Sequence, residues 1–279
     1  LCILTHTKPS DEVILSDDCH IIQHEVGAAG LISGVQLRTI ECDSGMMPIK
    51  AIKKRIRGTD IHYPLTRLIC IENAHGDGVV LPLDYMASIR ELADEHGISI
   101  HLDGARLFNA ATYLDTDVKE ITKHVDTVMF CLSKGLCAPV GSLIAGSKAF
   151  IDKARKNRKL MGGGMRQVGV LAAPGLIALR DMRLRLHEDH ENATTLAKGL
   201  NHIKEIDIDK SSVHINLVFF NFNVTVDEPE FINYMSSKGI IINGSEHYKM
   251  RFATNNGVSQ ADIERVLRGV EDFFDQEDK

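Results

Sequence analysis

The sequence predicts an α/β protein with a large domain built on a mostly parallel sheet, followed by a smaller C-terminal α+β domain. Short β-rich runs alternate with helix-period segments in the first half, which is the pattern of βαβ units. A long helical stretch follows, and the rhythm of the elements changes after it. With 279 residues, 44% of them hydrophobic, the chain is long enough for one large or two modest domains with a sizeable core.

The predicted large domain covers 1–167, and its strands are short aliphatic runs separated by helices. The strands are expected at 12–15, 35–40, 68–72, 98–103, 127–131 and 142–145. The helices are expected near 25–32, 48–57, 84–96 and 148–159.

The predicted second part consists of a connecting helix at 168–206 and a small domain at 207–279. Within the small domain we expect strands at 215–222, 240–242 and 249–254. Two helices should begin at Asp227 and Ser259, because each has an acidic residue three positions on, Glu230 and Asp262, as in a capping box.

The composition excludes several classes of protein. The formal net charge of −6 is spread over interspersed signs, so no basic stripe favours nucleic-acid binding. No apolar run reaches the roughly 18 to 20 residues of a membrane span, and the opening 1–4 lacks the basic flank of a signal peptide. The six cysteines show no Cys-x-x-Cys spacing and predict reduced core residues in a cytosolic protein without a metal site.

A lysine and an aspartate at strand ends are the most informative residues. Lys134 follows the apolar run 127–131 and precedes a turn of small residues, while Asp103 ends the run 98–103. A half-buried lysine can be neutral enough to form a Schiff base, and an aspartate can keep a pyridine nitrogen protonated. Lys134 alone could be a solvated loop residue and Asp103 a helix cap, but together they indicate pyridoxal 5'-phosphate.

Other polar residues are expected at the same edge of the sheet, where open α/β sheets bind ligands. His75 follows the strand that ends at Glu72, and Arg106 follows Asp103. The glycine-rich segment 162–164 lies after a basic helix rather than a strand, so it does not fit a dinucleotide site. Lys159 and Arg166 on either side of it suit a phosphate or a carboxylate, or else the segment is an interdomain hinge.

Four ordered motifs carry a resemblance to a known family. They are Asn73-Ala74-His75, the run from His101 to Asn109, the lysine segment 130–142, and 159–167. They resemble the low-specificity L-threonine aldolases of the aspartate-aminotransferase fold, the fold type I of pyridoxal phosphate enzymes. The similarity runs from Asp11 to about Asp262.

The resemblance implies roles around the cofactor. Lys134 would bond covalently to pyridoxal phosphate, Asp103 would face its ring nitrogen, and Arg106 would bond its phenolate oxygen. His20 matches the histidine that stacks on the ring. A Ser-Gly-Thr type loop that holds the phosphate would lie ahead of Leu1, so we expect a protein made strictly from Leu1 to bind the cofactor weakly.

The resemblance also implies how the amino-acid substrate is held. His75, or else His20, would take the proton from the substrate hydroxyl, and Arg251 would bind the carboxylate. His24 lies at a position where, in this family, an aromatic residue often lines the pocket for the side chain of the substrate. Lys159 and Arg166 would approach the active site of a neighbouring subunit, Arg166 toward the cofactor, in a homo-oligomer that is a dimer of dimers.

The expected activity is cleavage of L-threonine or L-allo-threonine to glycine and acetaldehyde in the cytoplasm. Two alternatives stay open from the sequence: another enzyme of the same scaffold, such as an aminotransferase or a β-eliminating lyase, and a catalytically silent relative that acts as a binding partner.

Overall fold

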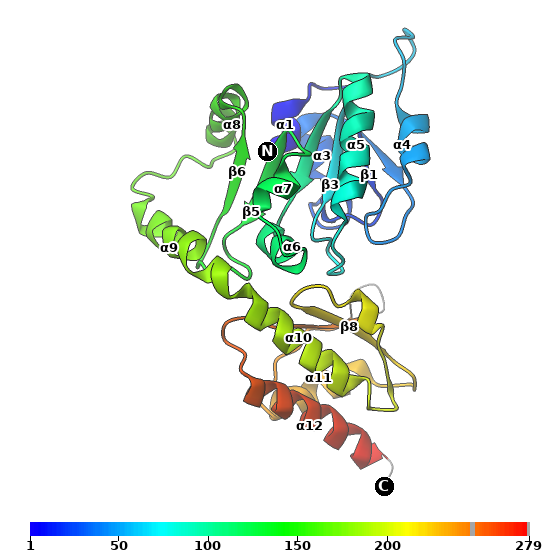
Figure 1. Ribbon diagram of the computed structural model, residues 1–279, viewed down its shortest axis with the longest axis vertical. Helices are drawn as coiled ribbons and strands as arrows, with labels where there is room; N and C mark the ends of the chain where they lie inside the picture. The colour runs from blue at the N-terminus through cyan, green and yellow to red at the C-terminus, as the bar shows by residue number, and fades with distance from the viewer. Residues whose placement is uncertain (246–248, 278–279) are drawn as a thin grey trace. The chain divides into compact units, whose positions relative to one another are not determined.

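The computed structural model describes residues 1–245 and 249–277, and these form two compact units (Figure 1). The first unit is Leu1–Gly76 with Val80–Arg183, and the second is Asp77–Val79 with the described residues from Leu184 onward. No helix within the described ranges combines the length and the apolar character needed to cross a membrane.

In the described part of the first unit lies a six-stranded sheet with the order β2-β1-β3-β4-β5-β6. Its strands are β1 (Glu12–Ser16), β2 (Gln36–Ile40), β3 (Thr66–Glu72), β4 (Ser99–Asp103), β5 (Thr127–Cys131) and β6 (Ser142–Gly146). All neighbours are parallel except β5 and β6. The predicted mostly parallel α/β sheet is therefore confirmed, and each strand lies where its aliphatic run predicted it.

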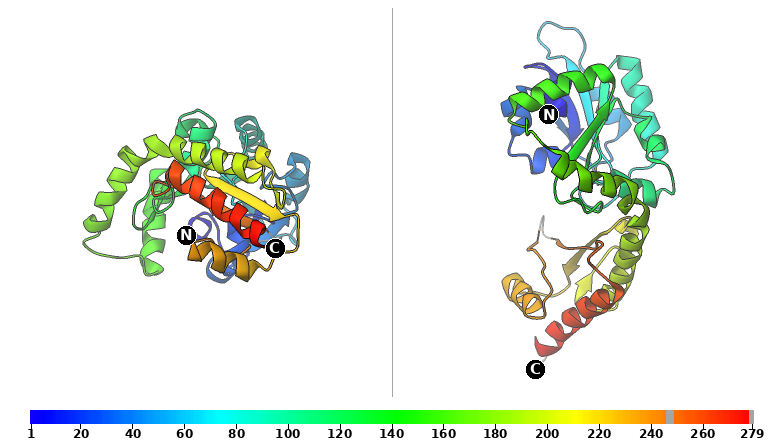
Figure 2. Two further views of the ribbon diagram at one scale, coloured as in Figure 1. Left: turned by 90° about the horizontal axis from the view of Figure 1, so that it is seen from below. Right: turned by 90° about the vertical axis from the view of Figure 1, so that its left-hand side faces the viewer.

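Helices cover both faces of this sheet, which explains why successive residues of its central strands are buried rather than alternately buried and exposed. All of β1 and the residues from Leu68 to Glu72 in β3 are buried. Figure 2 shows the sheet between two groups of helices in its right-hand view. The first unit contains α1 (Cys2–His6), α2 (His20–Gln23), α3 (Ala28–Ser33), α4 (Ile49–Arg55), α5 (Leu83–His96), α6 (Leu107–Tyr113), α7 (Val118–Thr122), α8 (Lys148–Leu160) and α9 (Gly169–Arg180).

The second unit is an α+β layer built on the antiparallel strands β7 (Ile206–Asp207), β8 (Leu217–Phe222) and β9 (Met250–Ala253). Its helices are α10 (Leu186–Leu200), α11 (Glu228–Ser237) and α12 (Gln260–Glu277). Phe220, Phe231 and Phe252 lie in its core.

Both predicted caps in this unit are confirmed. The Asp227 side chain accepts a hydrogen bond from the Glu230 N–H at 3.0 Å. Ser259 and Asp262 exchange hydrogen bonds in both directions, as a capping box requires.

Two expectations about this half of the chain are wrong. The stretch 168–206 is not one connecting helix: α9 belongs to the first unit, a 3₁₀ turn follows at Met182–Arg185, and α10 belongs to the second. Arg185 fixes the new helix start, because its Nη2 lies 2.9 Å from Asp189 Oδ1 and 3.1 Å from Glu188 Oε2.

The expected strand at 240–242 is also absent from the described structure. Ile240 and Ile242 are buried and Ile241 is 89% exposed, so the alternation of a strand is present. However, this segment joins no ladder among the described strands, because it follows the end of α11 and packs its two buried side chains into the core instead.

Candidate active site

Three neighbouring strands end at the same edge of the sheet, as the sequence predicted. β3 ends at Glu72 and β4 at Asp103, and the two residues are partners in the parallel ladder. Beyond the strands, the Gly104 N–H donates to the Met129 carbonyl at 2.9 Å, which ties the end of β4 to β5. Lys134 lies in the turn that follows β5.

The amine of Lys134 is half-buried beside other charges. Burial lowers its pKa, the positive charge of Arg106 lowers it further, and Asp103 and Glu72 act in the opposite direction. A lysine with a lowered pKa is neutral more often and is therefore a better nucleophile. The turn is closed by a hydrogen bond from the Cys137 N–H to the Lys134 carbonyl at 2.9 Å.

Asp103 is a buried carboxylate, 8% exposed. Burial raises its pKa, while the Ala105 N–H at 3.1 Å, Lys134 and His20 favour the charged form. The residue after it must be glycine, because a Cβ on Gly104 would lie 2.8 Å from the Met129 carbonyl oxygen. This close approach of β4 to β5 sets Asp103 at the strand end.

Glu72 is a member of this cluster that the sequence analysis missed. Its side chain is 4% exposed, and its Oε2 accepts a hydrogen bond from the His20 N–H at 2.8 Å. Burial raises the pKa of Glu72 to about 7, and the charge of Asp103 raises it as well, whereas His75 lowers it. The sequence could have indicated Glu72, because it is an acidic residue that ends a predicted strand, as Asp103 does.

One histidine, His20, lies beside these carboxylates at the start of α2, and a second, His24, follows the end of that helix. His20 begins α2, and its Nδ1 lies 3.1 Å from Glu25 Oε1, which orients the ring. His24 follows the helix, is exposed, and has its ring 4.9 Å from that of His20. The structure thus brings His20 to the strand-end cluster and places His24 next to it.

His75 is buried in the loop after β3. Its Nε2 lies 3.5 Å from Asp18 Oδ1, and a Cβ on Gly45 would lie 2.9 Å from its Cδ2, so Gly45 packs against the ring. Burial raises the pKa of Asp18, but the hydrogen bond and charge of His75, together with hydrogen bonds from Ser16 and Gly45, outweigh it and leave that pKa lowered. Asp18 was also missed, because in sequence it reads as one of two acidic loop residues.

Ligand atoms of Asp17, Asp18 and Cys42 lie within 4.8 Å of one another. Asp18 already interacts with His75 and accepts the Gly45 N–H at 3.0 Å, and Cys42 Sγ donates to Asp18 at 3.9 Å. These internal contacts account for the group, and we assign no metal to it.

Lys159 and Arg166 are not brought to the cluster within the part of the first unit that the structure describes. Lys159 and Arg166 are exposed near the end of α8, where the Lys159 side chain lies so close to Gly164 that a Cβ there would be 2.7 Å from Nζ. Arg251 lies in β9 of the second unit, with its guanidinium 5.9 Å from the Phe219 ring. Their roles stay predictions.

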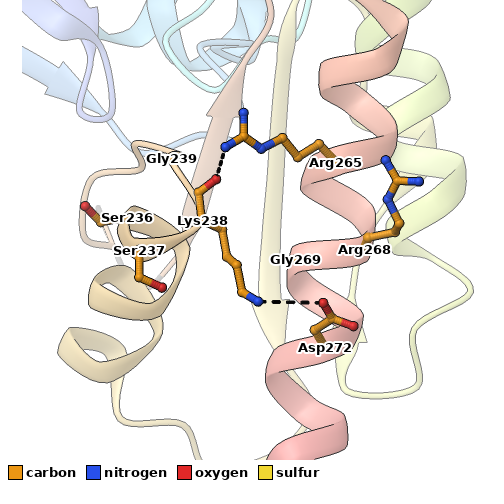
Figure 3. A pocket seen from close by; sticks show the side chains of 8 residues that line it. All are labelled: Ser236, Ser237, Lys238, Gly239, Arg265, Arg268, Gly269 and Asp272. Atoms are coloured by element: carbon orange, nitrogen blue, oxygen red, sulfur yellow. Dashed lines mark hydrogen bonds and ion pairs between the residues drawn. The ribbon is translucent and has the colours of Figure 1, made fainter.

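The second unit has a crevice of about 630 Å³ between α11 and α12 (Figure 3). Two of its basic residues have structural partners: Arg265 donates to the Lys238 carbonyl, and Lys238 Nζ lies 4.0 Å from Asp272 Oδ2. Cations at the end of a helix satisfy its last carbonyls, so capping of α11 explains these residues.

The chain thus has an α/β fold with a half-buried lysine and a buried aspartate at the carboxyl edge of a mostly parallel sheet, and solved structures show to which class of folds it belongs. A threonine aldolase from Leishmania major matches with a TM-score of 0.80 and 21% identity, over 98% of this chain and 80% of that one. A PLP-dependent aminotransferase from Streptococcus suis matches with a TM-score of 0.76 and 19% identity, over 100% and 75%. The fold is that of the fold-type-I pyridoxal phosphate enzymes.

The family follows from the sequence comparisons. The model of the beta-eliminating lyase family matches residues 1–223. A protein of Arabidopsis thaliana named "Probable low-specificity L-threonine aldolase 2" is 39% identical over 98% of this chain and 79% of its own length. The chain belongs to the beta-eliminating lyase family, and the resemblance to threonine aldolases is confirmed.

Proposed function

We propose that this chain is a pyridoxal-phosphate-dependent lyase that cleaves L-threonine or L-allo-threonine to glycine and acetaldehyde. The observation that carries the proposal is the Lys134 amine, with its lowered pKa, beside the buried Asp103 at the carboxyl edge of β3, β4 and β5. The relative that bears the name of a threonine aldolase supports the choice of reaction.

The residues of the cluster fit pyridoxal phosphate. A lysine held partly neutral can attack its aldehyde, and a buried carboxylate suits a protonated ring nitrogen. Arg106, next to both, offers planar donors for the phenolate oxygen. When bound, the cofactor supplies an electron sink for the charge left on Cα as the Cα–Cβ bond breaks.

The protein's own groups handle the substrate. The hydroxyl must lose its proton, and His75 and His20 are the candidate bases, each with a carboxylate that orients the ring: Asp18 at 3.5 Å and Glu25 at 3.1 Å. Arg251 is proposed to bind the carboxylate in a bidentate contact.

The remaining predicted residues belong to the same proposal. His24, beside His20, would face the side chain of the substrate, and Lys159 and Arg166 would act at the site of a neighbouring subunit in a homo-oligomer. Lys159 and Arg166 are both exposed on this chain, as is expected of residues that act at the site of a neighbouring subunit.

Transamination is the second candidate, and the likeness to an aminotransferase fold favours it. The products separate the two reactions. Incubation of the coenzyme-loaded protein with L-threonine should release acetaldehyde and glycine, whereas transamination would need an oxo acid and would yield a new one.

Lys134→Ala tests the site. We expect it to abolish the visible absorbance of covalently bound coenzyme and to reduce turnover by roughly 10³-fold or more. The matched control is Lys148→Ala, because the Lys148 side chain is 87% exposed on α8. Normal absorbance and activity in Lys134→Ala would refute the site, and a wild-type protein that binds no coenzyme would indicate a silent relative.

A further inference from the structure

Glu72 is a buried carboxyl group that the proposed chemistry does not use. It ends β3 beside Asp103, its register partner, so the two side chains leave adjacent strands on the same face. Both are buried, at 4% and 8% exposure. Two carboxylates this close in a water-poor site cannot both hold a negative charge without a strong penalty.

We propose that Glu72 is a positioning residue that carries the proton of this carboxyl pair, so that the negative charge stays on Asp103, while its Oε2 holds the backbone of His20. The inference rests on the proposed function, since it gives Asp103 the charge needed to face a protonated ring nitrogen. Glu72 itself touches neither substrate nor cofactor in this proposal.

Each carboxyl accepts a backbone N–H, so the neighbouring charge decides which member of the pair carries the proton: the Lys134 amine interacts more strongly with Asp103 than with Glu72. Asp103 accepts the Ala105 N–H at 3.1 Å and has the amine of Lys134 nearby, and both favour its ionised form. Glu72 receives one N–H, from His20 at 2.8 Å, and burial dominates its environment. Deprotonating Glu72 therefore needs a higher pH than deprotonating Asp103.

Charged groups on every surrounding element act on Glu72. Asp103 favours the protonated carboxyl, and the positive charges of Arg106 and His75 favour the ionised one. Among the described residues, the titratable ones around it are Cys19 and His20 around the start of α2, His75 after β3, Asp103 on β4, Arg106 before α6, and Lys134 after β5.

The tether to His20 gives the same carboxyl a second effect. Glu72 and His20 lie on different elements, and this hydrogen bond joins the end of β3 directly to the first residue of α2. Because a protonated carboxyl still has a carbonyl oxygen that accepts, the proton and the tether are compatible. Glutamine mimics this state, whereas aspartate keeps the acid but shortens the reach.

The test is an infrared pH titration of the full chain, before and after pyridoxal phosphate is added, because protonated carboxyl groups absorb apart from carboxylates. The wild type should lose one buried protonated carboxyl with a midpoint near pH 7, against 4.5 for an ordinary glutamate. The band should be missing in Glu72→Gln and present in the exposed control Glu120→Gln. In Asp103→Asn its midpoint should fall, because the neighbouring charge is gone.

Three results would overturn the proposal: a wild-type midpoint near 4.5, a band that persists in Glu72→Gln, or a midpoint unmoved by Asp103→Asn. The titration before coenzyme is added does not depend on catalysis, so it can succeed even if no acetaldehyde is formed. In the active protein, turnover should fall roughly tenfold or more in Glu72→Ala and less in Glu72→Gln. Equal losses in the two variants would contradict the role of the protonated carboxyl.

Discussion

Two buried glutamates in the same sheet have different surroundings. Glu12 begins β1 at the amino edge and is 0% exposed, and Glu72 ends β3 at the carboxyl edge and is 4% exposed. Arg57 Nε and Arg38 Nη1 lie 3.0 Å and 3.3 Å from Glu12 Oε2. Glu72 instead receives a backbone N–H and lies beside another carboxyl group.

The difference distinguishes a buried charge that stabilises the fold from a buried charge that serves the candidate site. At the amino edge a buried carboxylate is matched by two arginines, which is the condition under which such a charge is tolerated. At the carboxyl edge, Glu72, Asp103 and Lys134 leave charge partly unmatched, and their pKa values shift. Unmatched charge that converges from several strand ends is typical of a reactive site.

The difference between the two edges can be tested by neutralising one carboxylate at each. Asp103→Asn, at the carboxyl edge, should have the largest effect on turnover. Turnover should fall by roughly 10²-fold or more, because the charge that faces the ring nitrogen is lost. The free energy of unfolding should change by less than about 1 kcal/mol, because the cost of burying the ionised Asp103 offsets what the Ala105 N–H and Lys134 contribute. Steady-state kinetics and urea unfolding measure both. Unchanged turnover would contradict the role of Asp103.

Glu12→Gln should give the opposite result. Removing one partner of a buried ion pair leaves Arg38 and Arg57 uncompensated, so the free energy of unfolding should fall by about 3 kcal/mol. Both arginine side chains are partly exposed, at 20% and 25%, which sets the expected loss at the lower end. Turnover per folded molecule should stay within about twofold of the wild type. A large loss of turnover without loss of stability would contradict the assignment of Glu12 to structure.

The pH dependence of the free energy of unfolding tests the protonation of Glu72 at the carboxyl edge. A carboxyl whose folded pKa is raised, from 4.5 to about 7 for Glu72, stabilises the fold below pH 4.5, and this contribution is lost as the pH rises to 7. The wild type should therefore lose up to about 3 kcal/mol relative to Glu72→Gln across this window. Urea unfolding of the coenzyme-free proteins at several pH values measures the difference. Parallel curves for the two proteins would refute it.

How far the sequence predicts this molecule depends on whether a signal is local. The aliphatic runs predicted the strands of the first unit, and the caps at Asp227 and Ser259 were visible as residues three positions apart. Lys134 and Asp103 stood out because a charged residue ends an apolar run. The 3₁₀ break before α10 was missed, because the contacts of Arg185 leave no mark on hydrophobic periodicity.

The partners of the site residues could not be predicted for the same reason. The hydrogen bond from His20 to Glu72 and the contact of His75 with Asp18 join residues far apart in the chain. Glu12 likewise reads as the polar first residue of a strand, and nothing local says that Arg38 and Arg57 meet it. A sequence predicts which residues end strands, while the charges around them depend on the tertiary fold.

The smallest effect on turnover is expected at a pair of neutral histidines, His6 and His101, at the amino side of the sheet. The Thr127 hydroxyl lies 2.7 Å from His6 Nε2 and 2.9 Å from His101 Nδ1, and burial lowers the pKa values of His6 and His101 to about 4 and about 3. Both rings are thus neutral near pH 7, and the hydroxyl can donate to one and accept from the other. Thr127→Val should leave both ring nitrogens without this partner and lower the free energy of unfolding by about 1 to 2 kcal/mol.

Turnover is the second measurement on Thr127→Val. It should be unchanged, because the contact of Thr127 with His6 and His101 stabilises the fold and takes no part in the proposed reaction. The matched control is Thr195→Val, because the exposed Thr195 hydroxyl donates to the Glu191 carbonyl of its own helix at 2.9 Å. It should change the free energy of unfolding by no more than about 0.5 kcal/mol. If Thr127→Val reduced turnover as strongly as Asp103→Asn, the division between a structural amino edge and a functional carboxyl edge would be wrong.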